Sequence, residues 1–343
     1  MSLTGTKEVK RILVTGASGF IGSFIVEEGL RRGYEVWAAV RRTSSKAYLS
    51  DTRIRFVELN LGDKTELRTQ LQRCPCFNYV VHAAGATKCL RKADFFRTNT
   101  DGTRHLAEAL MEEGLVPERF IFVSSLSVFG AVRESRPYQP IRLTDEAKPN
   151  TAYGESKWAA EEFLRTLDAN RFPYVILRPT GVYGPREKDY FVMVKSIKGH
   201  MDFAAGWQPQ DITFVYVQDV VQAIYRAMDA EDVVGKAYFL SDGAVYSSRT
   251  FADLVQKELG IKCVMHVKAP LWMMRLICHT GDRWMRLTGK LTVLNKDKYN
   301  ILTQRNWQCD IMPARRDLGY EPEWPLERGV HETIKWYREA GWL

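Results

Sequence analysis

The 343-residue sequence has no run of apolar residues approaching the roughly 20 that a membrane-spanning helix needs. Its first eleven residues, MSLTGTKEVKR, contain no apolar segment, so we expect no signal peptide and a cytoplasmic location. The six cysteines are scattered, and Cys74 and Cys76 have no second Cys or His pair at the spacing of a zinc finger. These absences predict reduced thiols, no metal site and no membrane association.

The sequence also lacks internal repeats, low-complexity segments and any long basic run. Its 49 Lys and Arg against 41 Asp and Glu give a formal charge of +8. Without a basic run this charge does not predict nucleic-acid binding, and it fits an ordinary solvated surface or an anionic small-molecule partner. The 45% hydrophobic and 26% charged residues are typical of a globular protein.

The first half of the chain alternates short apolar runs with amphipathic stretches. The expected strands are 11–16, 34–40, 54–59, 79–85, 119–125 and 174–179. The expected helices are 21–33, 63–72, 99–114 and 153–168. Continuous apolar strands alternating with helices predict an α/β fold, a doubly wound parallel sheet of the Rossmann type with helices on both faces.

The pattern loosens after about residue 180. We expect residues 1–180 to form a dinucleotide-binding domain, with 215–245 returning to it. Residues 181–343 would then form a smaller, partly helical substrate-binding lobe over the carboxyl ends of the strands.

A glycine-rich turn follows the first expected strand and opens the first helix. In VTGASGFIGS, the first glycine permits a tight turn, the second lets the backbone approach a pyrophosphate, and the third lets helix and strand pack closely. The start of the helix supplies free N–H groups to phosphate. The predicted cofactor contacts here are Gly16, Ser18, Gly19, Phe20, Ile21 and Gly22.

The end of the second strand distinguishes between two dinucleotides. An acidic residue at this point would bind the ribose 2′-hydroxyl of NAD(H). The sequence AAVRRTSS has no acid there and instead has Arg41 and Arg42. Guanidinium groups suit a 2′-phosphate, so the sequence predicts NADP(H) in preference to NAD(H).

Tyr153 and Lys157 in YGESK stand four residues apart at the start of an expected helix, and therefore share one face. An ammonium one turn away would lower the pKa of the phenol from about 10, so that it exchanges protons near neutral pH. The segment FVSSLSVFG offers Ser124, Ser125 and Ser127 at the end of the fifth strand, where they could polarise a carbonyl.

Seven stretches together resemble the extended short-chain dehydrogenase/reductase family, in the family's order and over about two-thirds of the chain. They are TGASGFIG, HAAG, NTDGT, VSSLSVFG, YGESK, LRPTGVYGP and VYVQDVVQA. The resemblance implies that Ser125 is the catalytic serine, Tyr153 the acid/base and Lys157 its partner. The further cofactor contacts that it implies are Asn60, Leu61, Ala83, Ala84, Gly85, Asn99, Pro179 and Val182. The family usually has Asp at the position of Asn60.

Two positions depart from the nucleotide-sugar epimerases of the family. These commonly have Asn at the position of Gly181 and a diphosphate-binding Arg at the position of Ile212. The strand end VWAAVRR and the tail 314–337 instead resemble the dihydroflavonol reductase and 3β-hydroxysteroid dehydrogenase branch. We therefore expect an NADP-dependent oxidoreductase that interconverts a ketone and a secondary alcohol. The alternatives are an epimerase or dehydratase with tightly bound NAD, and a non-catalytic NADP-binding regulator.

The substrate lobe has an apolar segment at 270–287 that allows three interpretations: lobe core, a pocket for a hydrophobic carbonyl or alcohol, and a membrane-surface helix with Arg275, Arg283 and Arg286 on a polar side. The apolar residues considered are Trp207, Trp272, Met273, Met274, Leu276, Ile277, Trp284 and Met285. The resemblance also leaves open a homodimer formed through the helices that contain NTDGT and YGESK.

Overall fold

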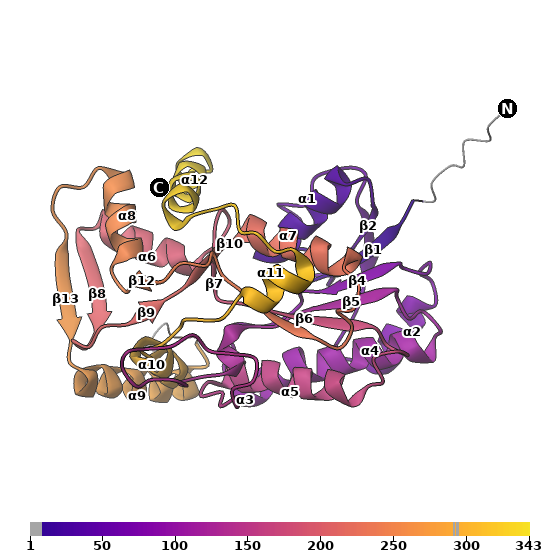
Figure 1. The fold of residues 1–343 in the computed structure, drawn as a ribbon, viewed down its shortest axis with the longest axis horizontal. Helices are drawn as coiled ribbons and strands as arrows, with labels where there is room; N and C mark the ends of the chain where they lie inside the picture. Colours follow the sequence, from indigo (N-terminus) through magenta and orange to yellow (C-terminus); the bar gives the residue numbers. More distant parts are fainter. Residues whose placement is uncertain (1–8, 291, 293–294) are drawn as a thin grey trace.

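A seven-stranded sheet forms the core of the larger of two lobes, in a computed structural model that describes residues 9–290, 292 and 295–343 (Figure 1). The strand order is β11-β6-β5-β4-β1-β2-β3, and every neighbouring pair is parallel. The strands are β1 (Arg11–Thr15), β2 (Glu35–Val40), β3 (Arg55–Glu58), β4 (Tyr79–His82), β5 (Arg119–Val123), β6 (Tyr174–Pro179) and β11 (Ala237–Leu240). The order reverses between β1 and β4, which creates a crevice at their carboxyl ends.

Helices cover both faces of this sheet, because its central strands are apolar on both sides. One face carries α1 (Phe20–Arg31), α7 (Val217–Asp229) and α11 (Met312–Leu318), and its core includes Ile12, Val14 and Ile224. The other face carries α2 (Lys64–Leu71), α4 (Gly102–Glu112) and α5 (Ala152–Thr166), around Leu13 and Phe122. The predicted doubly wound fold is confirmed.

The helix expected over 99–114 is interrupted near its start. The chain forms the short α3 (Lys92–Phe95), then a π-helical segment, η1 (Phe96–Asp101), and only then α4. A wider π-helical turn redirects side chains and is frequent at functional sites. It places Asn99 in the middle of the turn, where the side chain is fully buried.

The second lobe is built from strand pairs and helices. β7 (Gly181–Tyr183) pairs with β10 (Phe214–Tyr216), β8 (Met201–Ala205) with β13 (Met265–Ala269), and β9 (Asp211–Ile212) with β12 (Tyr246–Ser247). The helices are α6 (Asp189–Lys198), α8 (Thr250–Leu259), α9 (Leu271–Thr288), α10 (Lys296–Thr303) and α12 (Leu326–Glu339). The buried ring of Tyr183 packs edge-on against Phe251 at 5.5 Å, within an aromatic core.

The interpretation of 270–287 as lobe core is wrong for most of its large side chains, which are exposed. The interpretation as a substrate pocket stays a prediction. Exposed side chains in and near α9 are Trp207, Trp272, Leu276, Ile277 and Trp284. Met273, Met274 and Met285 are half-buried, and Cys278 is buried. The helix covers its lobe with one face and leaves an apolar face open. None of the described helices is long and apolar enough to cross a membrane.

Candidate active site

The glycine-rich turn leads from β1 into α1 and packs against residues 83–84, which follow β4. Gly16 has φ +69°, and a Cβ on it would lie 2.6 Å from the backbone N of Ala84. Gly22 packs so closely on the Gly16 carbonyl that a Cβ there would collide with it. A side chain at either position would force the turn off its neighbours, so the two glycines are required by close backbone approach.

The N-terminus of α1 is open to an anion. Gly19 occupies the N-cap without a side-chain hydrogen bond, and the first turn contains no acidic residue. Ser18 is half-buried in the turn, while Phe20 and Ile21 pack against the aromatic core of the second lobe. Free N–H groups and the positive end of the helix dipole therefore fit the pyrophosphate of a dinucleotide.

Residues 83–85 leave the end of β4 and run beside the reacting groups. A Cβ on Gly85 would lie 3.2 Å from Asn99 Oδ1 and 3.3 Å from Lys157 Nζ. Ala83 and Ala84 line the other side of the same turn, against Gly16. The predicted contacts from β1, β4 and α5 thus meet at one edge of the sheet, the edge at which ligands bind in sheets of this kind.

Two buried polar side chains hold this edge in place. Asn99 Oδ1 accepts a hydrogen bond from Ala86 N at 2.7 Å, and its Nδ2 donates to Ala86 O at 3.0 Å and to Ser156 Oγ at 2.9 Å. His82 lies 2.6 Å from Thr15 Oγ1 and 3.0 Å from Thr103 Oγ1, and burial lowers its pKa to about 3. The neutral imidazole therefore has a structural role, linking β4 to β1 and α4.

The Ser125 and Tyr153 side chains lie beside each other at the edge of the sheet, and the Ser125 hydroxyl donates a hydrogen bond to Ser127 Oγ at 3.2 Å. Ser125 caps the turn after β5, where its Oγ accepts a hydrogen bond from Ser127 N at 3.2 Å. Tyr153 lies in the first turn of α5, a helix capped by Thr151. Burial raises the pKa of Tyr153 to about 12, and the neighbouring Ser125 hydroxyl opposes this shift. The prediction that Lys157 lowers this pKa is wrong, because burial dominates and the opposing group is Ser125.

Lys157 lies one turn behind Tyr153 and is almost fully buried. Its Nζ donates a hydrogen bond to Val123 O at 2.8 Å and stands over the Phe122 ring at 4.5 Å. Burial lowers the pKa of Lys157 to about 8, and the negative charge of Glu161 opposes the shift. The ammonium therefore persists at neutral pH and loses its proton only in mildly alkaline solution.

Glu161 continues the face of α5 that carries Tyr153 and Lys157, and the sequence analysis missed it. It accepts hydrogen bonds from Ser124 Oγ at 2.6 Å and from Arg178 Nε at 3.0 Å. Glu161 and Arg178 are 0% and 2% exposed, so the pair is buried behind the catalytic groups. Its spacing of four residues from Lys157 was the available signal.

The predicted adenosine end of the site lies at the rim of the sheet. Arg41 and Arg42 are both exposed after β2, and neither guanidinium forms an ion pair with the described residues. The Asn60 side chain is occupied locally: it accepts from Gly62 N at 3.1 Å and donates to Glu66 Oε2 at 2.5 Å. Leu61 is half-buried and its carbonyl accepts a hydrogen bond from the His105 ring.

The opposite end of the crevice is formed by the segment after β6. Pro179 is buried at the end of that strand, and Val182 is half-buried in β7. Between them, Gly181 faces Tyr190 of α6, and a Cβ on Gly181 would collide with the phenol oxygen. The tyrosine thus occupies the space into which an Asn side chain at 181 would project.

A charged group on the second lobe was also missed. Asp297 accepts a hydrogen bond from Ala152 N at 2.9 Å, which seats the start of α10 on the residue preceding Tyr153. The next residue, Lys298, is half-buried, and burial lowers its pKa while Asp189 opposes the shift. Lys88, from the loop after β4, forms an ion pair with Asp189 across the two lobes. No apolar periodicity pointed to these residues.

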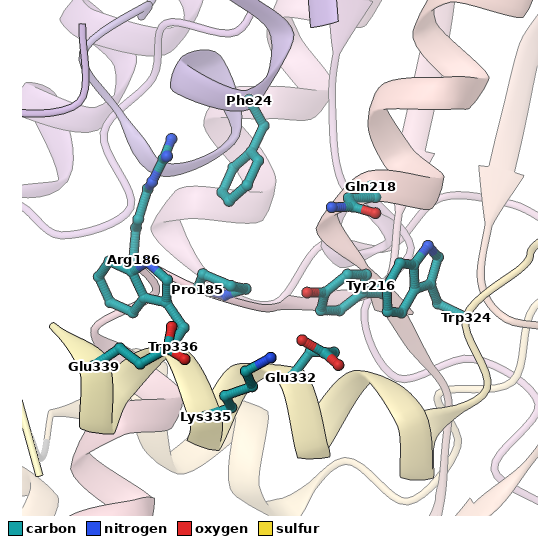
Figure 2. A pocket seen from close by; sticks show the side chains of 10 residues that line it. All are labelled: Phe24, Pro185, Arg186, Tyr216, Gln218, Trp324, Glu332, Lys335, Trp336 and Glu339. Atoms are coloured by element: carbon teal, nitrogen blue, oxygen red, sulfur yellow. The ribbon is translucent and has the colours of Figure 1, made fainter. Parts of the chain in front are cut away.

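A separate cavity of about 260 Å³ lies between α1, the loop after β7 and α12 (Figure 2). Aromatic rings and charged side chains line it, among them Phe24, Tyr216 and Trp336. Arg186 bridges it to α1 by donating to Ser23 Oγ at 2.9 Å and Glu27 Oε1 at 2.6 Å. Its lining contains none of the predicted site residues.

The chain is similar to known proteins over almost its whole length. A UDP-glucose 4-epimerase of Vibrio cholerae is 28% identical, over 98% of this chain and 98% of its own. A ceramide reductase of Caulobacter vibrioides is 28% identical, over 97% and 96%. A solved UDP-glucose 4-epimerase of Thermotoga maritima has the same fold, with a TM-score of 0.76, 24% identity and coverage of 96% and 99%.

Residues 12–240 match the family described as "NAD dependent epimerase/dehydratase family". This span includes the glycine-rich turn, Ser125, Tyr153 and Lys157. The protein is therefore an NAD(P)-dependent enzyme acting on CH–OH groups of a small molecule, and the chain belongs to the NAD dependent epimerase/dehydratase family.

Proposed function

We propose that the protein is an NADP-dependent reductase that interconverts a ketone and a secondary alcohol on a hydrophobic substrate. The observation that carries the proposal is the grouping of Ser125 and Tyr153 at the edge of the sheet, with the buried Lys157 one turn behind on the same helix. When bound, the nicotinamide supplies the hydride. The chain's own groups orient the carbonyl and move the proton.

Each of these groups has a distinct role in the proposal. A phenol with a pKa of about 12 keeps its proton at neutral pH, so Tyr153 can donate that proton to a forming alkoxide. The Ser125 hydroxyl orients the substrate oxygen. Lys157 has one N–H on Val123 O, which leaves its other N–H groups for ribose hydroxyls. A dinucleotide would lie from Gly16 to Val182, with the 2′-phosphate beside Arg41 and Arg42.

The second candidate is a nucleotide-sugar epimerase with tightly bound NAD, which a relative named UDP-glucose 4-epimerase favours. Two features weigh against it. Tyr190 fills the space for the epimerase asparagine at Gly181. Ile212 packs against the aromatic core of the second lobe, and its own side chain has no charge to pair with a diphosphate. A relative named ceramide reductase supports a reductase of a lipid-like substrate.

Titration with NADPH and NADH tests the cofactor. We expect tighter binding of NADPH, and the variant Arg41→Ala/Arg42→Ala should lose this preference by about tenfold or more, the value of one charge-assisted hydrogen bond. Arg73→Ala is the matched control, since Arg73 is also exposed and forms no ion pair with the described residues. Preference for NADH, or NAD that survives purification, would favour the epimerase.

The variant Tyr153→Phe tests catalysis. We expect it to lose turnover while keeping NADPH affinity, because the phenol oxygen is removed and the binding turn is untouched. A non-catalytic NADP-binding regulator would show no turnover in either form. Turnover that survives in Tyr153→Phe would refute the assignment of the acid.

A further inference from the structure

Helix α9 is apolar on two opposite faces, although the fold buries only one. Met274, Cys278 and Met285 lie on the side that faces the lobe. The exposed apolar side chains of the helix are Trp272 at 71%, Leu276 at 59%, Ile277 at 38%, Trp284 at 60% and Leu287 at 77%. Packing within the described chain accounts for the first face alone, and the second face has no packing partner among the described residues.

The exposed face combines apolar and basic side chains. At 3.6 residues per turn, Trp272, Leu276 and Leu287 fall within about 60° of one another. Arg283 projects among them and Arg275 borders them, and both are exposed without an ion pair to the described residues. The one acidic residue of α9, Asp282, is half-buried and accepts a hydrogen bond from Lys296 N at 3.2 Å.

The apolar surface continues past the start of the helix. Trp207 is 63% exposed and directly follows Gly206. A Cβ on Gly206 would lie 3.0 Å from Leu271 Cδ2, which places the two segments against each other. The tryptophans at 207 and 272 therefore flank the start of α9, and Trp284 belongs to its last part. The helix itself lies at the lower left of Figure 1.

We propose that the exposed face of α9 docks the protein onto an anionic lipid surface. An amphipathic helix with Trp and Leu on its exposed side and arginines beside them lies in the plane of a membrane interface. The formal charge of +8 adds attraction to anionic headgroups. A second copy packed with its α9 against this α9 would set the same arginines against each other, and the one acid of the helix, Asp282, is half-buried and bonded to Lys296 N, which opposes self-association through this face.

The position of α9 connects docking to the reacting centre. It packs on α10, whose Asp297 holds Ala152 N beside Tyr153. A docked protein would keep the α9–α10 edge of its second lobe at the lipid surface. An apolar substrate could then pass from the bilayer to the site along this edge. This path depends on the proposed reductase function, whereas binding to a lipid surface does not depend on it.

Vesicle flotation with the full chain tests the proposal. We expect binding to vesicles of phosphatidylcholine mixed with phosphatidylglycerol, weaker binding to phosphatidylcholine alone, and release by salt. Leu276→Glu should lower affinity for the mixed vesicles at least about tenfold, because a carboxylate cannot enter the interface. Met312→Glu is the matched control: Met312 is also 59% exposed, but it lies on α11 at the sheet.

A second pair of variants tests the charge. Arg275→Glu/Arg283→Glu should abolish the preference for phosphatidylglycerol, while Arg73→Glu should keep it. NADPH binding of each variant checks the fold, since none of these side chains touches the cofactor site. Absence of vesicle binding by the unaltered chain, or equal loss in Leu276→Glu and Met312→Glu, refutes the proposal. So does a dimer, seen by sedimentation equilibrium, that Leu276→Glu dissociates.

Discussion

Replacing Gly16 by alanine should separate the cost of backbone conformation from the cost of close packing. Gly16 has φ +69° and would place a Cβ 2.6 Å from Ala84 N. Gly33 at the end of α1 has φ +81°, and a Cβ there would meet nothing within 4 Å. The two positions share the strained backbone, and only Gly16 adds a collision, so Gly33→Ala is its matched control.

The expected magnitudes follow from these contacts. A left-handed conformation costs an L-residue about 1–2 kcal/mol, which both variants bear. Moving the Ala83–Ala84 backbone adds about 1–3 kcal/mol for Gly16→Ala, as in other overpacked interiors. The displaced turn would also lose at least one hydrogen bond to pyrophosphate, worth about 1.5–3 kcal/mol, or about 10- to 100-fold in cofactor affinity.

Urea unfolding and NADPH titration measure the two effects. Gly33→Ala should have a slightly lower urea midpoint than the unaltered protein and the same affinity for NADPH. Gly16→Ala should have a still lower urea midpoint and a weaker affinity for NADPH. If both variants show the same unfolding midpoint and the same affinity, then the turn does not depend on its contact with residues 83–84, and the reasoning fails.

Three further changes probe other parts of the structure. Glu161→Gln should lower the free energy of unfolding, measured in urea, by about 3–5 kcal/mol, since it leaves the buried guanidinium of Arg178 without its charged partner. The change should also lower the pKa of Lys157 below about 8, because the charge of Glu161 raises that pKa. An unchanged alkaline limb of the pH–activity profile would contradict the influence of Glu161 on Lys157. Gly181→Asn should lower the melting temperature, because its side chain would collide with the phenol of Tyr190. The double variant Gly181→Asn/Tyr190→Ala should recover part of this loss relative to Tyr190→Ala alone, and a double variant that recovers nothing would refute the contact. Burial raises the pKa of Asp219 to about 6, above its unfolded value, so the contribution of this group to stability should fall as pH rises from about 4 to about 6. The difference in urea midpoint between the unaltered protein and Asp219→Asn should therefore change over this pH range, and a constant difference would contradict the shift.

Local patterns in the sequence were enough for the fold and for most of the candidate site. Continuous apolar strands alternating with amphipathic helices predict a parallel sheet covered on both faces. A strand that is apolar on both sides has to be buried on both sides, and the apolar faces of the helices supply that cover. The glycine spacing in 16–22 and the four-residue spacing of Tyr153 and Lys157 are likewise local. They place groups on one turn or one helix face whatever surrounds them.

The tertiary structure decided what depends on neighbours far away in the chain. Burial sets the pKa of Tyr153, so the expected effect of Lys157 did not hold. Ser124 and Arg178, from different strands, meet Glu161 behind the site. The exposure of Trp272 could not be predicted. The sequence of a helix with two apolar faces is the same whether the second face packs against a core or is exposed to solvent. The spacing of residues along the sequence determines the side of a helix or strand on which each side chain lies. The burial of a side chain and its hydrogen-bond partners are determined only when the helices and strands pack together.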